Sequence, residues 1–273
     1  MTRRDELAAF LRARREALRP ADVGLPPGRG RRTPGLRREE IAVLAGVSVT
    51  WYTWLEQGRP INASVDVLEA LARSLQLDDA ERHHLLALAT RAPDEPMSEV
   101  EHAPDALVRL IASMDPAPAY VLGPRWEFLA WNRAQSHLYP MIDHLAPDDR
   151  NLLWVFFGEP TARELVVDWP DQARRILAEF RAGTIALRTD AKVLALVERL
   201  RHVSPEFAQW WAQLDVAQFQ TRVRCYHHPR AGELAFEYQQ LTPSEWPGLK
   251  VVCQLPLPGD DSAERLAAWR SIA

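Results

Sequence analysis

The sequence predicts two domains of different fold class, an all-helical N-terminal domain followed by a C-terminal domain of mixed helices and strands. Three observations lead to this prediction. Apolar residues recur with a helical period through roughly the first 90 residues. Residues 92–104 are rich in proline and acidic side chains, as linkers between domains are. After residue 219 the apolar period changes to two, which is the period of half-buried strands.

The composition is that of a globular protein. The chain has 273 residues, of which 47% are hydrophobic and 26% are charged, and this length is sufficient for two domains with separate cores. No apolar run approaches the ~18 residues that a membrane-spanning helix requires. The basic N-terminus lacks the apolar segment of a secretory signal. Two cysteines do not make a disulfide framework. We therefore expect a cytoplasmic protein that spans no membrane.

Positive charge is concentrated at the amino end of the chain. The formal net charge is −4, yet residues 1–38 hold eleven arginines against four acidic residues. One basic end on an otherwise acidic chain is typical of a DNA-binding domain, because contacts to phosphates supply much of the affinity for DNA. The alternative is an arginine-rich segment that is simply solvated.

Five helices are expected before the linker. The apolar spacing and the candidate capping residues place them at 5–18, about 38–45, 49–57, 65–75 and 79–90. Residues 19–35 hold four prolines and four glycines and are expected to form a loop or a basic arm. His83 and His84 are adjacent, so their side chains point about 100° apart on a helix and cannot bind one metal from the same face. Both are expected at the surface or at an interface.

The second and third helices form the most informative stretch. Gly46 tolerates the backbone angles of a sharp turn between helices. Ser48 is a good N-cap for the third helix, and Gly58 is expected to end it. The third helix then turns Tyr52 and Leu55 inward and small polar residues outward, which suits a DNA major groove. A plain helical hairpin is the structural alternative.

The sequence REEIAVLAGVS, followed by WLEQGR, resembles the helix-turn-helix domains of Cro/XRE-type bacterial regulators. This resemblance implies a role in binding a double-stranded DNA operator, as a homodimer in which the C-terminal domain supplies the dimer surface. Arg38 and Gln57 would contact the DNA backbone, and Trp51 would pack on it or fold back on the domain. Base edges would be contacted by Val49, Thr50 and Thr53, and further phosphates by Arg31, Arg37 and Arg59.

The expected domain boundaries are 1–91 for the helix-turn-helix domain, 92–104 for the linker and 105–273 for the second domain. In the second domain we expect strands at 119–123, 126–131, 219–227, 233–241 and 249–255, and helices at 105–114, 133–138, 161–167, 171–181, 190–201 and 205–214. Two strands come first, helices lie between, and three strands close the domain. An antiparallel sheet with helices on one face is the natural closure. This is the layout of a PAS-like sensor fold.

Several stretches of the second domain, among them PAYVLGPRWEFLAWNRA, SPEFAQWWAQLDV and HHPRAGELAFEYQQLT, resemble the ligand-binding domain of MmyB-type regulators. That resemblance implies a cavity for a fatty-acid-like or other small lipophilic effector, and no tightly bound cofactor. Aromatic side chains expected to line it are Trp126, Phe128, Trp131, Phe156, Trp210 and Tyr238. The polar candidates for holding the effector head group are Asn132, Arg224 and His228.

An enzyme is not favoured, because the chain has no glycine-rich phosphate loop, no G-x-S-x-G elbow and no HExxH metal motif. Cys225 and Cys253 could lie on neighbouring strands and form a regulatory disulfide, although two core thiols are the simpler interpretation. The competing hypothesis for the whole chain is a small-molecule-binding protein or enzyme whose helical N-terminus makes only protein contacts.

Overall fold

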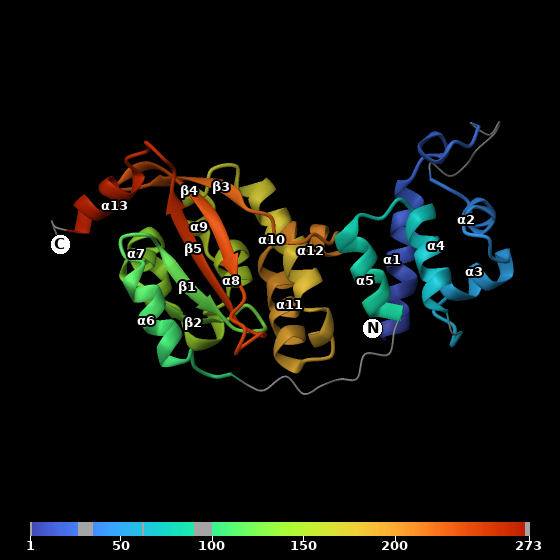
Figure 1. Cartoon of the computed structure of the whole chain (residues 1–273), viewed down its shortest axis with the longest axis horizontal. Coiled ribbons are helices and arrows are strands. Elements are labelled where there is room, and N and C mark those ends of the chain that lie inside the picture. Colours follow the sequence, from blue (N-terminus) through green and yellow to red (C-terminus); the bar gives the residue numbers. More distant parts are fainter. Residues whose placement is uncertain (1, 27–34, 62, 90–99, 271–273) are drawn as a thin grey trace. The chain divides into compact units, whose positions relative to one another are not determined.

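The computed structural model describes residues 2–26, 35–61, 63–89 and 100–270. The chain divides into two compact units. The first comprises Met1–Glu95, Arg181–Arg188 and Trp210–Gln218, and the second comprises Pro96–Phe180, Thr189–Gln209 and Phe219–Ala273. Figure 1 shows the helices at the amino end and the five-stranded sheet of the second unit. No described helix combines the length and the apolar character that crossing a membrane requires.

Five α-helices make up the first unit before the linker, as the sequence predicts. They are α1 (Arg3–Ala17), α2 (Arg38–Leu44), α3 (Val49–Glu56), α4 (Val65–Ser74) and α5 (Asp79–Ala89), with a 3-10 helix η1 at Pro20–Val23. Thr2, Ser48 and Ser64 each accept a backbone N–H of the helix that follows, because donors of the first turn have no partner inside the helix. Helix α1 begins two residues earlier than expected, since Thr2 and Asp5 form a capping box.

The turn between α2 and α3 has the predicted chemistry. Gly46 and Gly58 both have φ of +68°, a left-handed conformation that favours glycine, so Gly58 ends α3 as expected. The inward sides of the helices form one core, in which Ile41, Tyr52 and Leu55 are buried. The predicted orientation of α3 is therefore confirmed.

His84 on α5 is buried, which corrects the expectation that both histidines lie at the surface or at an interface; His83 is exposed. The imidazole of His84 packs edge-on against Phe10 with ring centroids 5.1 Å apart, and its Nδ1 has no partner among the described residues. Burial, together with the charges of Arg181 and Arg14, lowers the pKa of His84 from 6.5 to about 4. The ring is therefore neutral at pH 7.

We expect the first unit to lose stability in mild acid because of His84. Its pKa is lower in the folded state than in the unfolded state, so its contribution is complete above pH 6.5 and is lost as the pH falls toward 4. The shift corresponds to about 3 kcal/mol of unfolding free energy. Denaturant unfolding at pH 7 and pH 4.5 measures the difference in unfolding free energy. His84→Leu should remove much of the difference, whereas His83→Gln should keep it; equal pH dependence in both variants would contradict the prediction.

The second unit is built on a five-stranded sheet. Its strands are β1 (Ala119–Leu122), β2 (Phe128–Trp131), β3 (Arg222–His228), β4 (Gly232–Leu241) and β5 (Lys250–Pro256), in the spatial order β2-β1-β5-β4-β3, with every pair antiparallel. Tyr120 lies opposite Val252, and Arg224 lies opposite Phe236. Along β3, buried and exposed side chains alternate, as a period of two requires.

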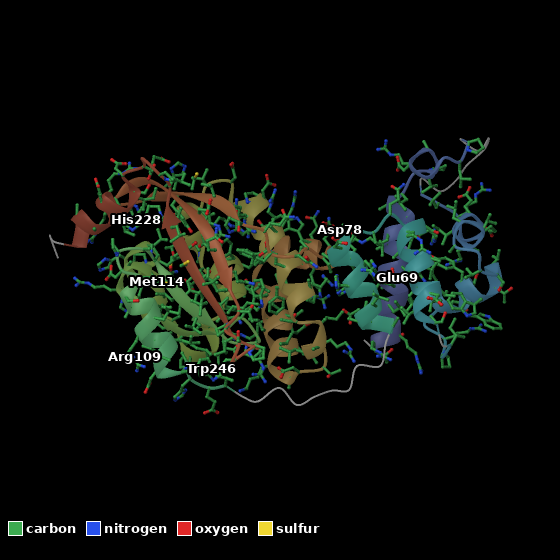
Figure 2. The ribbon with its side chains drawn as sticks, viewed as in Figure 1. Glu69, Asp78, Arg109, Met114, His228 and Trp246 are labelled. Atoms are coloured by element: carbon green, nitrogen blue, oxygen red, sulfur yellow. The ribbon has the colours of Figure 1, made fainter. Side chains whose placement is uncertain are left out.

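Helices cover both faces of this sheet. The helical segments that follow the linker are α6 (Asp105–Ser113), α7 (Arg133–Leu138), η2 (Pro140–His144), η3 (Pro147–Asp149), α8 (Leu152–Phe157), α9 (Pro160–Leu165), α10 (Trp169–Gly183), η4 (Ile185–Leu187), α11 (Ala191–Val203), α12 (Pro205–Trp211) and α13 (Ser262–Arg270). Of these, η4 and the C-terminal ends of α10 and α12 belong to the first unit. Helix α6 packs Leu107 and Ile111 on Val121 and Cys253, with Met114 and Trp246 beside this cluster (Figure 2). Helices α8 and α10 contribute side chains to a cavity on the opposite face, where Tyr120 points. The C-terminal helix α13 was not expected from the sequence.

The two cysteines are free and do not lie on neighbouring strands. Cys225 is exposed on β3 and Cys253 is buried on β5, with β4 between them. Burial raises the pKa of the Cys253 thiol. The structure therefore does not place them for the disulfide considered above.

Candidate functional site

Helix α3 presents one exposed side. Val49 is 37% exposed, Thr50 and Gln57 are exposed, and Thr53 is half-buried. Trp51 is also half-buried and packs against the core of the first unit, so of its two expected positions it takes the one folded back on the domain. The polar residues singled out from the sequence thus lie on the outer side of a helix whose inner side is fully buried.

Trp54 was missed by the sequence analysis. It is 39% exposed, and the guanidinium of Arg59 lies over its indole at 5.6 Å from the ring centroid. The spacing offered a signal, because residues 50, 54 and 57 share one face of a helix. The αL turn at Gly58 directs Arg59 back toward α3, and the Arg59 N–H donates to the carbonyl of Trp54 at 3.0 Å.

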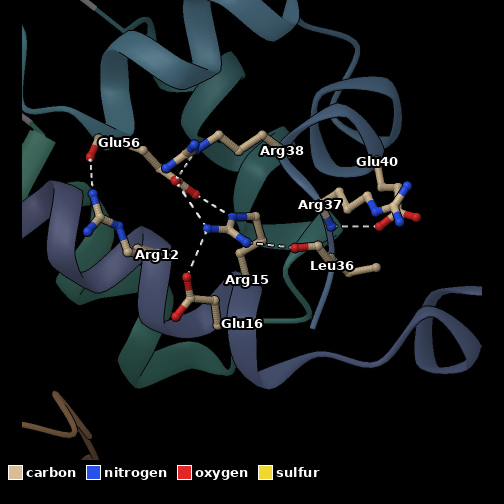
Figure 3. A network of polar contacts seen from close by, with 8 residues as sticks. All are labelled: Arg12, Arg15, Glu16, Leu36, Arg37, Arg38, Glu40 and Glu56. Carbon is tan, nitrogen blue, oxygen red and sulfur yellow. Dashed lines mark hydrogen bonds and ion pairs between the residues drawn. The ribbon is translucent and has the colours of Figure 1, made fainter. Parts of the chain in front are cut away.

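A buried carboxylate fixes α3 to its neighbours (Figure 3). Glu56 is fully buried and accepts from Arg15 Nε at 2.5 Å and from Arg38 Nε at 2.7 Å. Arg15 also donates to the carbonyl of Leu36 at 2.7 Å. Burial by itself would raise the pKa of Glu56, but the hydrogen bonds from Arg15 and Arg38 lower it below its usual value. One ion network therefore ties α1, α2 and α3 together.

The structure gives Arg38 a partner that the sequence did not predict. Its Nε is used by Glu56, although its side chain remains 38% exposed. Arg37 is exposed, and its backbone N–H donates to Glu40 at 2.6 Å. Arg59 is also exposed. Arg31 lies outside the described residues.

The second unit encloses a small cavity of about 20 Å³ between the sheet and helices α8 and α10. This volume holds roughly one water molecule. Its walls combine aliphatic, aromatic and charged side chains. They are Tyr120, Leu122, Trp126, Leu152, Ile176, Glu179, Phe219, Arg222, Arg224, Tyr238, Gln240 and Val252. Three of the predicted residues, Trp126, Arg224 and Tyr238, therefore meet at one cavity.

Arg224 is buried without a carboxylate partner. It is 1% exposed, and no described acidic side chain lies within ion-pair distance of it. Its Nε donates to the amide oxygen of Gln172 at 3.3 Å, and its Nη1 has no hydrogen-bond partner among the residues that the structure describes. Its guanidinium lies over the rings of Tyr238, at 4.1 Å, and Phe156, at 5.0 Å. Arginine stays charged in proteins, so the cavity wall holds a positive charge that these rings stabilise only in part.

Several neutral polar groups near Arg224 are joined to one another by hydrogen bonds, although the buried hydroxyl of Tyr139 has no hydrogen-bond partner among the described residues. The hydroxyls of Tyr226 and Tyr238 are 2.8 Å apart, and Tyr226 donates to Gln254 at 2.7 Å. The Gln254 amide donates in turn to Gln135 at 2.8 Å. Burial raises the pKa of Tyr226 well above 10, so its hydroxyl stays neutral. The chain of hydrogen bonds therefore supplies no anion to balance Arg224.

Trp126 lies in the turn between β1 and β2 with a strained backbone. Its φ is +66°, which is rare for a bulky residue, and it is 4% exposed. Its indole contacts Phe180 edge-on at 5.4 Å between centroids, and the Lys250 ammonium lies over it at 4.7 Å. Burial lowers the pKa of Lys250 to about 8. The indole Nε1 is buried and has no hydrogen-bond partner in the described part of the chain.

Two of the polar candidates are already fully engaged. Asn132 caps α7, accepts from the N–H groups of Ala119 and Gln135, and donates to the carbonyls of Ile111 and Ala117. His228, labelled in Figure 2, contacts the His137 carbonyl at 2.9 Å through Nε2 and accepts from the Ala231 N–H through Nδ1. In this structure both side chains already use their hydrogen-bonding groups within the protein.

The remaining aromatic candidates lie away from the cavity surface. Phe156 is buried against Arg224, and Phe128 packs on Tyr120 with ring centroids 5.1 Å apart. Trp131 donates from its indole to Asp143 at 2.8 Å. Trp210 belongs to the first unit. Their aromatic character could be read from the sequence, but their positions depend on how the helices pack.

A larger hollow of about 570 Å³ lies between α11 and β2, with Arg125, Lys192 and Arg199 in its wall. Arg125 binds both oxygens of Asp190, at 2.9 and 2.7 Å, and Arg199 pairs with Asp149. Arg150 also lines this hollow, and its Nε donates to the carbonyl of Leu145 at 3.2 Å. These three arginines are only half-buried, whereas Arg224 is fully buried, so the charge of Arg224 is the more strongly desolvated and favours an anionic partner more.

Comparison with known families finds two separate matches along the chain. Residues 6–85 match a helix-turn-helix domain, and residues 103–268 match the MmyB-like transcription regulator ligand binding domain. No curated protein matches the sequence. A helix-turn-helix domain joined to a ligand-binding domain is the organisation of a transcription regulator that responds to a ligand. The second match spans more than half of the chain, which therefore belongs to the MmyB-like transcription regulators.

Proposed function

We propose that the protein binds a specific DNA operator through α3 and senses a lipophilic anion through the cavity around Arg224. The exposed side of α3 carries the first part of this proposal. Val49 and Thr50 stand at its amino end, where helix-turn-helix proteins contact base edges. The methyl groups of both residues suit a thymine methyl. Binding to chromosomal DNA would place the protein in the cytoplasm.

Phosphate contacts would come from the borders of this surface. Arg37 and Arg59 are exposed at the start of α2 and beyond the end of α3, and Gln57 is exposed beside them. Arg38 can offer its outer N–H groups while Glu56 holds its Nε. Thr53 and Arg31 complete the proposed contacts. Because such domains commonly bind palindromes as dimers, we propose a homodimer joined through the second unit.

The effector part of the proposal is carried by Arg224. A buried guanidinium without a counter-ion favours an anionic partner, and the aliphatic and aromatic walls around it favour an apolar tail. A fatty-acid-like molecule combines both features. The cavity holds only about one water molecule in this structure, so binding would select a more open form of the second unit.

Replacing Thr50 by alanine tests the DNA-binding surface. The operator is first selected from random DNA with the wild-type protein. Thr50→Ala should then lower affinity for that operator about tenfold, since a lost base contact costs about 1–3 kcal/mol, with little effect on non-specific DNA. Thr242→Ala, at an exposed position of the second unit, is the matched control. Gel shifts at several salt concentrations measure both, and affinity should fall steeply with salt.

Two results would contradict the proposal that the helical unit binds DNA. If neither the operator selection nor a random-DNA column retains the protein at low salt, the helical unit makes protein contacts only. Retention that survives deletion of residues 1–91 would also contradict the proposal, because the binding surface would then lie in the second unit.

A further inference from the structure

The polar groups around the cavity have an excess of donors. Three buried nitrogens have no hydrogen-bond partner in the described part of the chain: Nη1 of Arg224, Nε of Arg222 and Nε1 of Trp126. All three residues line the cavity. No buried carboxylate or amide oxygen of the described residues lacks a partner in the same way. Arg222 already has a counter-ion, because its Nη1 binds Glu179 at 2.5 Å. A ligand that fits these walls must therefore supply acceptor oxygens.

The residues that carry two of these donors are contacted by different turns of helix α10. Gln172 accepts from Arg224 near the start of this helix, and Phe180 contacts the Trp126 indole eight residues later. A rise of ~1.5 Å per residue separates these contacts by about 12 Å. The strand order gives a similar separation. Arg224 is on edge strand β3, and Trp126 follows β1, with β5 and β4 between them. At ~4.8 Å per strand, β1 and β3 are about 14 Å apart. One carboxylate is far too small to reach both.

We propose that the effector is an acyl chain anion with a second oxygen on the order of 10 Å from its carboxylate. The carboxylate pairs with Arg224, and the second oxygen, a hydroxyl or carbonyl, accepts the hydrogen bond of Trp126 Nε1. Apolar side chains between the two ends, Leu152 and Ile176, contact the chain. This inference rests on the proposed function, since it adds a second anchor to the same lipophilic anion.

Trp126 is suited to this role because its indole cannot turn toward another acceptor. Its backbone N–H donates to Gly123 at 3.0 Å, and its carbonyl accepts from Leu152 of α8, also at 3.0 Å. Phe180 and Lys250 hold the ring itself. A buried donor held in place discriminates strongly, because a ligand without an acceptor leaves it unsatisfied.

The test compares three acids on the full-length protein by calorimetry: decanoate, ω-hydroxydecanoate, and β-hydroxydecanoate as the control with its hydroxyl near the head. We expect ω-hydroxydecanoate to bind about tenfold more tightly than decanoate, and β-hydroxydecanoate to gain nothing. In Trp126→Phe, which keeps the aromatic ring but removes the N–H, the order should reverse, because the ω-hydroxyl would then be buried without a partner.

Two outcomes would overturn the inference, and they are distinguishable. If wild-type protein binds decanoate as tightly as ω-hydroxydecanoate, Trp126 is not a ligand donor, while the proposed lipophilic anion stands. If none of the three acids binds, the proposed effector class fails and the second anchor fails with it. The wild-type comparison decides the matter even if the Trp126 variant does not fold.

Discussion

Replacing Glu56 by alanine is expected to destabilise the first unit by about 3–5 kcal/mol, because it leaves the buried guanidinium of Arg15 without its carboxylate. Arg38 would lose its partner as well. Since a domain of this size is stable by only about 5–15 kcal/mol, much of the unit would unfold near body temperature and DNA binding would disappear with it. Thermal and denaturant unfolding of the full chain measure the effect.

A charge-matched control separates this network from a general loss of acidic residues. Glu39 is exposed on α2, so Glu39→Gln should change stability by less than about 0.5 kcal/mol. The double variant Arg15→Met with Glu56→Leu should recover most of the loss, because apolar residues can replace a buried ion pair at little cost. A double variant as unstable as Glu56→Ala would show that the helices need these side chains for another reason.

Replacing Arg224 by methionine should have two opposite effects. The ligand-free protein is expected to become more stable by about 1–2 kcal/mol, because the desolvation of an unpaired charge outweighs its contacts with the two rings. Binding of a fatty acid should weaken at least about a hundredfold, since the charge-assisted hydrogen bonds are lost. Thermal unfolding with and without decanoate measures both quantities on one sample.

The matched control lies in the larger hollow. Arg199→Gln removes an arginine that already pairs with Asp149, and it should leave the binding of decanoate unchanged. If Arg199→Gln abolishes binding and Arg224→Met does not, the effector occupies the hollow between α11 and β2. A large loss of stability in ligand-free Arg224→Met would mean that the guanidinium has a structural role in the sheet.

Local chemistry explains why much of the fold could be predicted. Ser48 and Ser64 cap α3 and α4 as expected, because an N-cap acts on backbone groups two or three residues away. The alternation along β3 was expected, but which phase faces inward was not: Arg224 is buried whereas Val223 and Cys225 are exposed. Helix α13 was missed, and its hydrophobic pattern is weak. Its Ser262 hydroxyl accepts from the Ala235 N–H on β4 at 2.9 Å, a contact that depends on the folded sheet.

The candidate site was predictable only in part. The sequence indicated that Asn132 could cap a helix, and this cap is present, but it also uses the amide that was expected to hold a head group. Trp54 was missed although its spacing from Thr50 and Gln57 places it on the exposed face of α3. His84 was placed at the surface or at an interface because its burial depends on Phe10 of another helix.

The sequence by itself determined most of the order of the elements and the turn that separates α2 from α3. These properties follow from capping, periodicity and turn residues, whose effects extend over a few positions. The family was indicated separately, by the resemblance of several sequence motifs, and the family matches agree with it. Only the tertiary structure decided which charges are paired. Arg15 has Glu56 and Arg224 has no carboxylate, because the identity of a buried neighbour depends on residues far apart in the chain that meet only when helices and strands pack.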